Sequence, residues 1–131
     1  MENLHRELTE RIIAAFYEVY NTLGTGFLEK VCERSLMIEL ELGGMQAKAQ
    51  VPIAVSYKGK IVGNYSADIV VNDVVVLELK AAEVIAAEYE YQLINYLRAT
   101  EYEVGLVLNF GPKPQIRRKI YTNDRKKDLN S

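Results

Sequence analysis

The sequence predicts a single α/β (α+β) domain with a helical hairpin, a three-strand meander, a helix and one or two further strands. Three observations support this prediction. Apolar residues recur at steps of three and four in residues 4–42, the apolar pattern becomes strand-like in residues 50–80, and a second helical stretch then precedes a short apolar run. At 131 residues the chain is long enough for one core and short for two.

The helical hairpin is predicted from two amphipathic stretches. The first extends from Leu4 to Tyr20 and should end near Gly24-Thr25-Gly26, because glycine readily terminates a helix. The second extends from about Leu28 to Leu42 and should end at Gly43-Gly44.

The meander is predicted from three strand-like runs that short turns separate. The first run covers residues 50–57, where Pro52 suggests an edge or the start of a strand. Residues 58–60 form a turn into the second run, 61–71, and Asn72-Asp73 forms a turn into the third, 74–80. Connections of two or three residues are typical of antiparallel neighbours.

After Lys80, a helix is expected from about Ala81 or Val84 to Thr100 because this stretch is rich in Ala, Glu and Leu. A buried strand over residues 104–110, a turn and a final strand over residues 116–121 should follow. We therefore expect one domain over residues 1–121 and a polar, basic tail over residues 122–131.

Composition and charge narrow the class of protein. The chain is 49% hydrophobic with a net charge of −2, which is ordinary for a globular protein and argues mildly against a nucleic-acid binder. Residues 111–131 nevertheless hold seven basic and two acidic residues, so this end either contacts phosphate or serves as a solubilising tail. No apolar run approaches the roughly 20 residues of a membrane span. A cytoplasmic location without membrane contact is expected, and the lone Cys32 agrees with a reducing compartment.

Asp68, Glu78 and Lys80 are charged residues that interrupt apolar strands. Glu78 and Lys80 share one strand face, and Asp68 joins them if the two strands pair. Two close carboxylates repel unless a cation lies between them, and hard cations such as Mg²⁺ or Mn²⁺ accept these ligands. A lysine there could act on water or on a phosphate. Spacing alone leaves open the alternative that Asp68 caps a turn and Glu78–Lys80 is a surface ion pair.

Three further side chains are candidates for the same site. Glu29 opens the second helix, where it either suits the positive helix end or serves as a further metal ligand. Gln92 and Tyr96 lie four residues apart on one helix face and either hold a phosphate or water or belong to the core. The only histidine, His5, and the lone Cys32 form no recognisable catalytic or zinc motif.

Asp68, Glu78-Leu79-Lys80, and Gln92 with Tyr96 together resemble the PD-(D/E)xK nuclease superfamily. Residues 23–29, 65–68, 92–97 and 105–111 are similar, more narrowly, to the GxxExxY proteins, whose motif would begin at Gly26. The tyrosine that closes this motif is replaced by Cys32, and the proline before the acidic residue of the superfamily motif is replaced by Ala67.

This resemblance implies a restriction-endonuclease-like core, with a central mixed sheet flanked by helices. It implies that Asp68 and Glu78 bind Mg²⁺ or Mn²⁺, with Glu29 as an additional acid in the metal site. Lys80 would act on water or the scissile phosphate, while Gln92 and Tyr96 would support the substrate.

The leading hypothesis is therefore a metal-dependent nuclease that hydrolyses phosphodiester bonds of DNA or RNA. The alternative is a non-catalytic protein-interaction module on a nuclease-like scaffold, because the acidic body leaves little surface to bind a polyanion. A homodimer is expected from reach alone, since so small a domain engages a duplex more easily in pairs.

Overall fold

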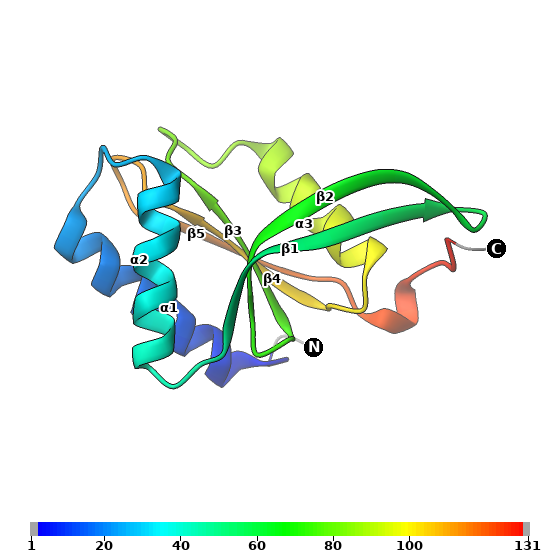
Figure 1. Ribbon diagram of the computed structural model, residues 1–131, viewed down its shortest axis with the longest axis horizontal. Helices are drawn as coiled ribbons and strands as arrows, with labels where there is room; N and C mark the ends of the chain where they lie inside the picture. Colours follow the sequence, from blue (N-terminus) through cyan, green and yellow to red (C-terminus); the bar gives the residue numbers. More distant parts are fainter. Residues whose placement is uncertain (1–2, 130–131) are drawn as a thin grey trace.

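A five-stranded mixed sheet forms the centre of the fold in residues 3–129, the part of the chain that this computed structural model describes. The strands lie side by side in chain order (Figure 1). They are β1 (Ala47–Tyr57), β2 (Lys60–Val71), β3 (Val75–Lys80), β4 (Val104–Asn109) and β5 (Gln115–Ile120).

Of the four strand pairs in this sheet, one is parallel and three are antiparallel. β1, β2 and β3 pair antiparallel, as the predicted meander requires, and β5 pairs antiparallel to β4. β3 and β4 are parallel, so the chain crosses between them through helix α3 (Ala87–Ala99). The predicted order of elements and the mixed central sheet are confirmed.

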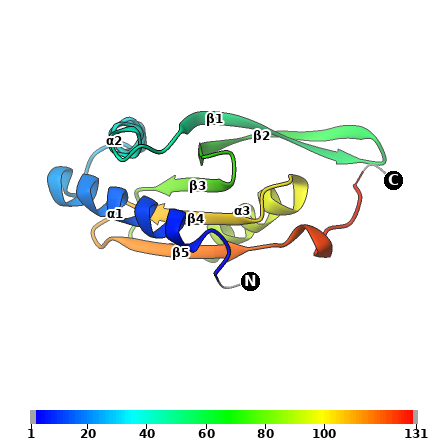
Figure 2. The same ribbon diagram turned by 90° about the horizontal axis from the view of Figure 1, so that it is seen from below.

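The helices cover the sheet on both faces. Helices α1 (Arg6–Leu23) and α2 (Glu29–Leu42) pack on one face, where Leu77 and Leu79 of β3 enter their core. Helix α3 packs on the other face against Val76 of β3 and Val107 of β4. Figure 2 shows α1 and α3 on opposite sides of β4. Alternate residues of β3 thus belong to different cores, which explains why that strand is apolar nearly throughout.

Helix α3 begins at Ala87, so the predicted start at Ala81 or Val84 is wrong. The buried Asn109 side chain accepts a hydrogen bond from Ala82 N–H (2.9 Å) and donates one to the Ala82 carbonyl (2.8 Å). A Cβ at Gly111 would lie 1.8 Å from the same carbonyl oxygen. The segment after β3 is therefore held against the end of β4 and turns into the helix only later.

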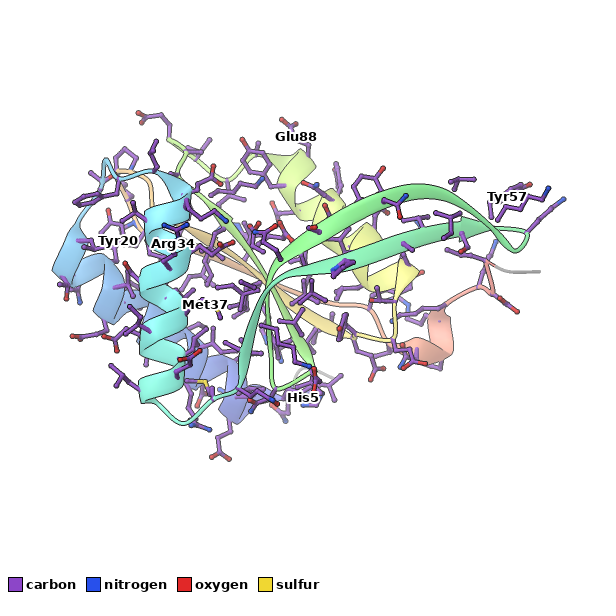
Figure 3. All side chains as sticks on the ribbon, in the orientation of Figure 1. His5, Tyr20, Arg34, Met37, Tyr57 and Glu88 are labelled. Atoms are coloured by element: carbon purple, nitrogen blue, oxygen red, sulfur yellow. The ribbon has the colours of Figure 1, made fainter. Side chains whose placement is uncertain are left out.

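The β1–β2 hairpin projects beyond the rest of the sheet (Figure 1). These strands have 11 and 12 residues, whereas β3 has six and pairs with β2 at three positions. Figure 3 shows Tyr57 at the tip of the projecting part and Glu88 near the start of α3. The projecting part of the hairpin and helix α3 thus lie on two sides of a region that is separate from the two hydrophobic cores.

The C-terminal segment returns to this hairpin. After β5 a short helix, η1 (Asn123–Arg125), leads to Lys126, whose ammonium donates to the carbonyls of Thr100 and Tyr102 at 2.8 and 2.6 Å. Further on, Lys58 N–H donates to the Leu129 carbonyl (2.7 Å).

The expected division into residues 1–121 and 122–131 includes residues 1–2 and 130–131, which lie outside the described part. Within residues 3–129, no helix is long and apolar enough to span a membrane.

Candidate active site

Strands β2 and β3 separate just where the two predicted acids occur. Their ladder consists of three pairs and ends at Ile69 opposite Leu77, so Asp68 and Glu78 are the next residues on each strand. Beyond this point side chains take over the hydrogen bonds. Leu79 N–H donates to Asp68 Oδ2 at 2.7 Å, and Asp68 N–H donates to Glu78 Oε1 at 3.3 Å. The two carboxyl groups are therefore interlocked at the fork between the strands.

The ladder on the other side of Asp68 is interrupted as well. β1 pairs with β2 through Ala49 and Val51 but not through Gln50, the residue level with Asp68. Gln50 has a φ of +53°, a left-handed conformation that is unfavourable for a residue other than glycine. Its amide donates to Glu33 Oε1 of α2 at 2.6 Å. A hydrogen bond that Gln50 donates to helix α2 thus accompanies the irregular backbone beside Asp68.

Glu78 is a buried carboxyl group with only 5% of its surface exposed. Burial first and the nearby charge of Asp68 second raise its pKa to about 8, against the lowering effects of the Asp68 N–H and the Lys80 charge. A side chain so buried excludes the alternative of a surface Glu78–Lys80 ion pair. Asp68 caps no turn, because its carboxylate accepts from the neighbouring strand.

Lys80 extends from the same strand face but does not pair with either acid. Its ammonium nitrogen lies 4.5 Å from the centroid of the Tyr89 ring, a cation–π contact. In the described chain, no ion pair links Lys80 to Asp68 or Glu78, although its charge lowers the Glu78 pKa. Tyr89 therefore positions Lys80 near the carboxyl groups without neutralising it.

Gln92 and Tyr96 of α3 form the third part of the arrangement. The Gln92 amide donates to the Tyr96 hydroxyl at 2.7 Å, which leaves the hydroxyl hydrogen to donate elsewhere. Burial raises the Tyr96 pKa, and the charges of Glu78 and Asp68 raise it further, so the phenol stays protonated near neutral pH. The structure thus brings Gln92 and Tyr96 close to the fork.

Glu29 lies apart from this group. It is exposed at the start of α2 and, with Asp68, Glu33 and Lys30, lines a pocket of about 220 Å³. Among residues 3–129, no three His, Cys, Asp or Glu side chains are grouped closely enough to hold a metal ion. Asp68 and Glu78 are therefore brought together, whereas Glu29 shares only the pocket with Asp68.

Comparison with known proteins gives this arrangement a family. The model of the PD-(D/E)XK nuclease superfamily matches residues 6–119. The chain belongs to this superfamily. A solved structure described as "Crystal structure of SSO0001" superposes with a TM-score of 0.58 at 19% identity, covering 90% of this chain and 59% of that one. The chain thus spans little more than half of that protein, and the likeness concerns the fold. No curated protein sequence matches.

Nucleases of the PD-(D/E)XK superfamily generally depend on divalent metal ions, and the donors at the fork suit such an ion. Asp68 and Glu78 offer only oxygen ligands, and each uses one carboxyl oxygen in the hydrogen bonds between the strands. Mg²⁺ is commonly held by one or two carboxylates, with water completing its shell. The residues present therefore fit a hard divalent cation without a third acidic side chain.

Sequence reasoning missed several residues of this superfamily member's site. One of them is Glu33, which is buried and forms an ion pair with Lys30 at 2.8 Å. Glu33 follows Glu29 by one helical turn, so the sequence indicates that the two acids share a helix face. The sequence does not indicate the burial or the ion pair. The left-handed Gln50 and the contact of Tyr89 with Lys80 were also unforeseen. Nothing in a single sequence marks these contacts, because they depend on where the strands separate.

Proposed function

We propose that this chain is a metal-dependent nuclease that hydrolyses phosphodiester bonds of DNA or RNA. The observation that carries the proposal is the fork between β2 and β3, where Asp68 and Glu78 interlock and Lys80 follows two residues later. A buried carboxyl group next to a second acid whose like charge repels it is costly to keep ionised, which makes Glu78 with Asp68 a candidate for a functional site.

Asp68 and Glu78 would hold Mg²⁺ or Mn²⁺ through the carboxyl oxygens that the strands leave unused. When bound there, the cation would lower the pKa of a water molecule and offset charge on a phosphate. Glu78 must lose its proton to act as a ligand, so the ion and the proton compete for the same carboxyl group. Glu29, which lines the same pocket as Asp68, would contribute as an additional acid.

Lys80 and Tyr96 would act on the substrate. The Lys80 ammonium, which Tyr89 holds without an anionic partner, would donate to a phosphate oxygen or orient the attacking water. Tyr96 accepts from Gln92 and keeps its own proton, so its hydroxyl would donate to a phosphate oxygen. Lys80 would thus supply a positive charge, and Tyr96 a hydrogen-bond donor, near the two acids.

Within the superfamily we further propose the GxxExxY branch. Gly26 in the loop before α2 and Glu29 in the first turn of α2, together with Gln92 and Tyr96 on α3, support this placement. Cys32, where the motif has a tyrosine, is buried among the apolar residues of α1 and α2. A hydroxyl at that position would therefore lie in the core rather than at the fork.

The test is a cleavage assay with labelled single- and double-stranded DNA and RNA. We expect cleavage of at least one substrate that requires Mg²⁺ or Mn²⁺, stops in EDTA and falls on the order of 100-fold in Asp68→Asn. Asparagine keeps an acceptor for Leu79 N–H, so the fold should survive. Asp73→Asn is the matched control, because Asp73 is exposed and forms an ion pair with Lys48 at the surface. Cleavage that persists unchanged in Asp68→Asn would refute the proposal.

A second candidate function is that of a non-catalytic interaction module. It is favoured by exposed apolar side chains on the projecting hairpin, among them Ile61 and Val62, which are 62% and 66% exposed. Under this alternative no substrate is cut with either metal, and Ile61→Lys abolishes association with a protein partner while Asp68→Asn leaves it unchanged.

A further inference from the structure

A pocket of about 490 Å³ lies between the projecting hairpin and α3. It is lined by Tyr65 of β2, by Tyr91 and Asn95 of α3, and by Leu129 of the C-terminal segment. Pockets for small organic ligands are typically about 300–1,000 Å³. The volume is therefore suited to one nucleotide-sized group rather than to a surface of a large partner.

The pocket is continuous with the candidate active site. Gln92 and Tyr96 line it, and the Tyr96 ring lies 5.7 Å from that of Tyr65, measured between centroids. The charges of Glu78 and Asp68 also act on the Tyr96 hydroxyl. Gln92 and Tyr96 therefore belong both to this pocket and to the candidate active site, although the carboxyl groups themselves do not line the pocket.

The chemistry of the lining matches that of a nucleobase with its phosphate. Tyr65 and Tyr91 both line the pocket, and they expose 50% and 64% of their surfaces. Asn95 is exposed beside them and offers both a donor and an acceptor for a base edge. Arg98 and Lys127, both exposed, place positive charge at the lining, where a phosphate would be attracted. Among the described residues that line the pocket, Glu88 is the single acidic one.

We propose that this pocket binds one unpaired nucleotide of a nucleic-acid strand, adjacent to the phosphate that the active site attacks. This inference rests on the proposed nuclease function and adds the substrate class: a nucleic acid that is unpaired where it enters the pocket. A base within a duplex is stacked on its neighbours and presents only its edges in the grooves, so tyrosine rings cannot stack on it. An unpaired base offers both faces to aromatic side chains.

The test compares binding of a fluorescein-labelled single-stranded DNA 12-mer, the RNA of the same sequence and the blunt DNA duplex by anisotropy. The measurement is made in EDTA, so it does not depend on cleavage. We expect the single strands to bind more tightly than the duplex, and Tyr91→Ala to weaken single-strand binding roughly 5- to 150-fold. Tyr57→Ala is the matched control, since Tyr57 is 60% exposed but does not line the pocket.

Duplex binding as tight as single-strand binding, or equal affinities for Tyr91→Ala and Tyr57→Ala, would overturn the inference. Because Tyr91 is largely exposed, its replacement should leave thermal unfolding within about 0.5 kcal/mol of the wild type, which excludes misfolding as the cause of weak binding. Metal-dependent cleavage that is lost in Asp68→Asn but prefers duplexes would refute this inference and keep the nuclease proposal. Single-strand binding that depends on Tyr91, without any cleavage, would support the pocket and refute the nuclease.

Discussion

Replacing Glu78 with glutamine is expected to stabilise the metal-free chain at alkaline pH. The folded chain holds the Glu78 proton up to a pKa of about 8, whereas an unperturbed glutamate loses it near 4.5. Between these values the unfolded chain has fewer protons bound, so rising pH favours unfolding. At about 1.4 kcal/mol for each pH unit, the wild type should lose at most about 5 kcal/mol across this interval. Glutamine carries no charge at any pH and should avoid this loss.

The assay is urea denaturation in EDTA at pH 5 and pH 8.5 for the wild type, Glu78→Gln and Glu88→Gln. Glu88 is exposed at the start of α3, so its replacement controls for the loss of one acidic charge (Figure 3). We expect the free energy of unfolding to fall between the two pH values in the wild type and in Glu88→Gln, and to fall much less in Glu78→Gln.

Mg²⁺ provides the second arm of the same experiment. An ion that binds only the folded chain stabilises it by about 2.7 kcal/mol at 100 times its dissociation constant. At pH 8.5 this gain should appear in the wild type and be strongly reduced in Glu78→Gln, which has lost a carboxylate ligand. Parallel pH dependence of wild type and Glu78→Gln would show that burial does not hold the Glu78 proton and would refute the reasoning.

Three other predictions concern Lys80, Gly111 and the oligomeric state. Lys80→Met retains the apolar stem over Tyr89 and should reduce cleavage on the order of 100-fold without lowering the melting temperature; unchanged cleavage would remove Lys80 from the reaction. Gly111→Ala should destabilise the fold by about 3 kcal/mol in urea denaturation, because its Cβ would lie 1.8 Å from the Ala82 carbonyl oxygen. A substitution that proves neutral would contradict this contact. Light scattering at micromolar concentrations should give the mass of a homodimer, and a monomer mass would reject that expectation.

The elements were largely predictable because their signals are local. Alternating apolar residues and the turns at Lys58-Gly59 and Asn72-Asp73 predicted the meander, and all four turn residues have positive φ values, as tight hairpin turns require. The start of α3 was not predictable in this way. It depends on Asn109, which bonds to Ala82 from 27 residues away along the chain.

The candidate site was predictable in composition but not in arrangement. Strand alternation and the expected strand pairing predicted that Asp68, Glu78 and Lys80 lie close together. In the structure they do lie close together. The pattern does not reveal that the ladder stops one residue before the acids. It also does not reveal that Tyr89, rather than Glu78, contacts the lysine. Both facts depend on tertiary packing, which the sequence of a single strand does not determine by itself.

The interruption of the sheet at Asp68 explains how two acids occupy a largely apolar region. If the β2–β3 ladder continued regularly, Asp68 would pair directly with Glu78, and both side chains would project on one face. Two like charges would then lie side by side without nearby N–H donors, an arrangement that a buried site does not tolerate. Separation of the strands instead releases N–H groups of Asp68 and Leu79, and each donates to a carboxyl oxygen.

The same interruption has a backbone cost that the surrounding side chains offset. Gln50, level with Asp68 on β1, adopts the left-handed conformation, which costs roughly 1–2 kcal/mol for such a residue. Its hydrogen bond to the buried Glu33, itself paired with Lys30, ties this strained position to α2. Backbone strain that neighbouring contacts maintain is typical of functional sites. The irregular strands, the bond to α2 and the paired acids are thus parts of one arrangement, in which regular strand pairing is absent at the position where the proposed metal site requires free carboxyl oxygens.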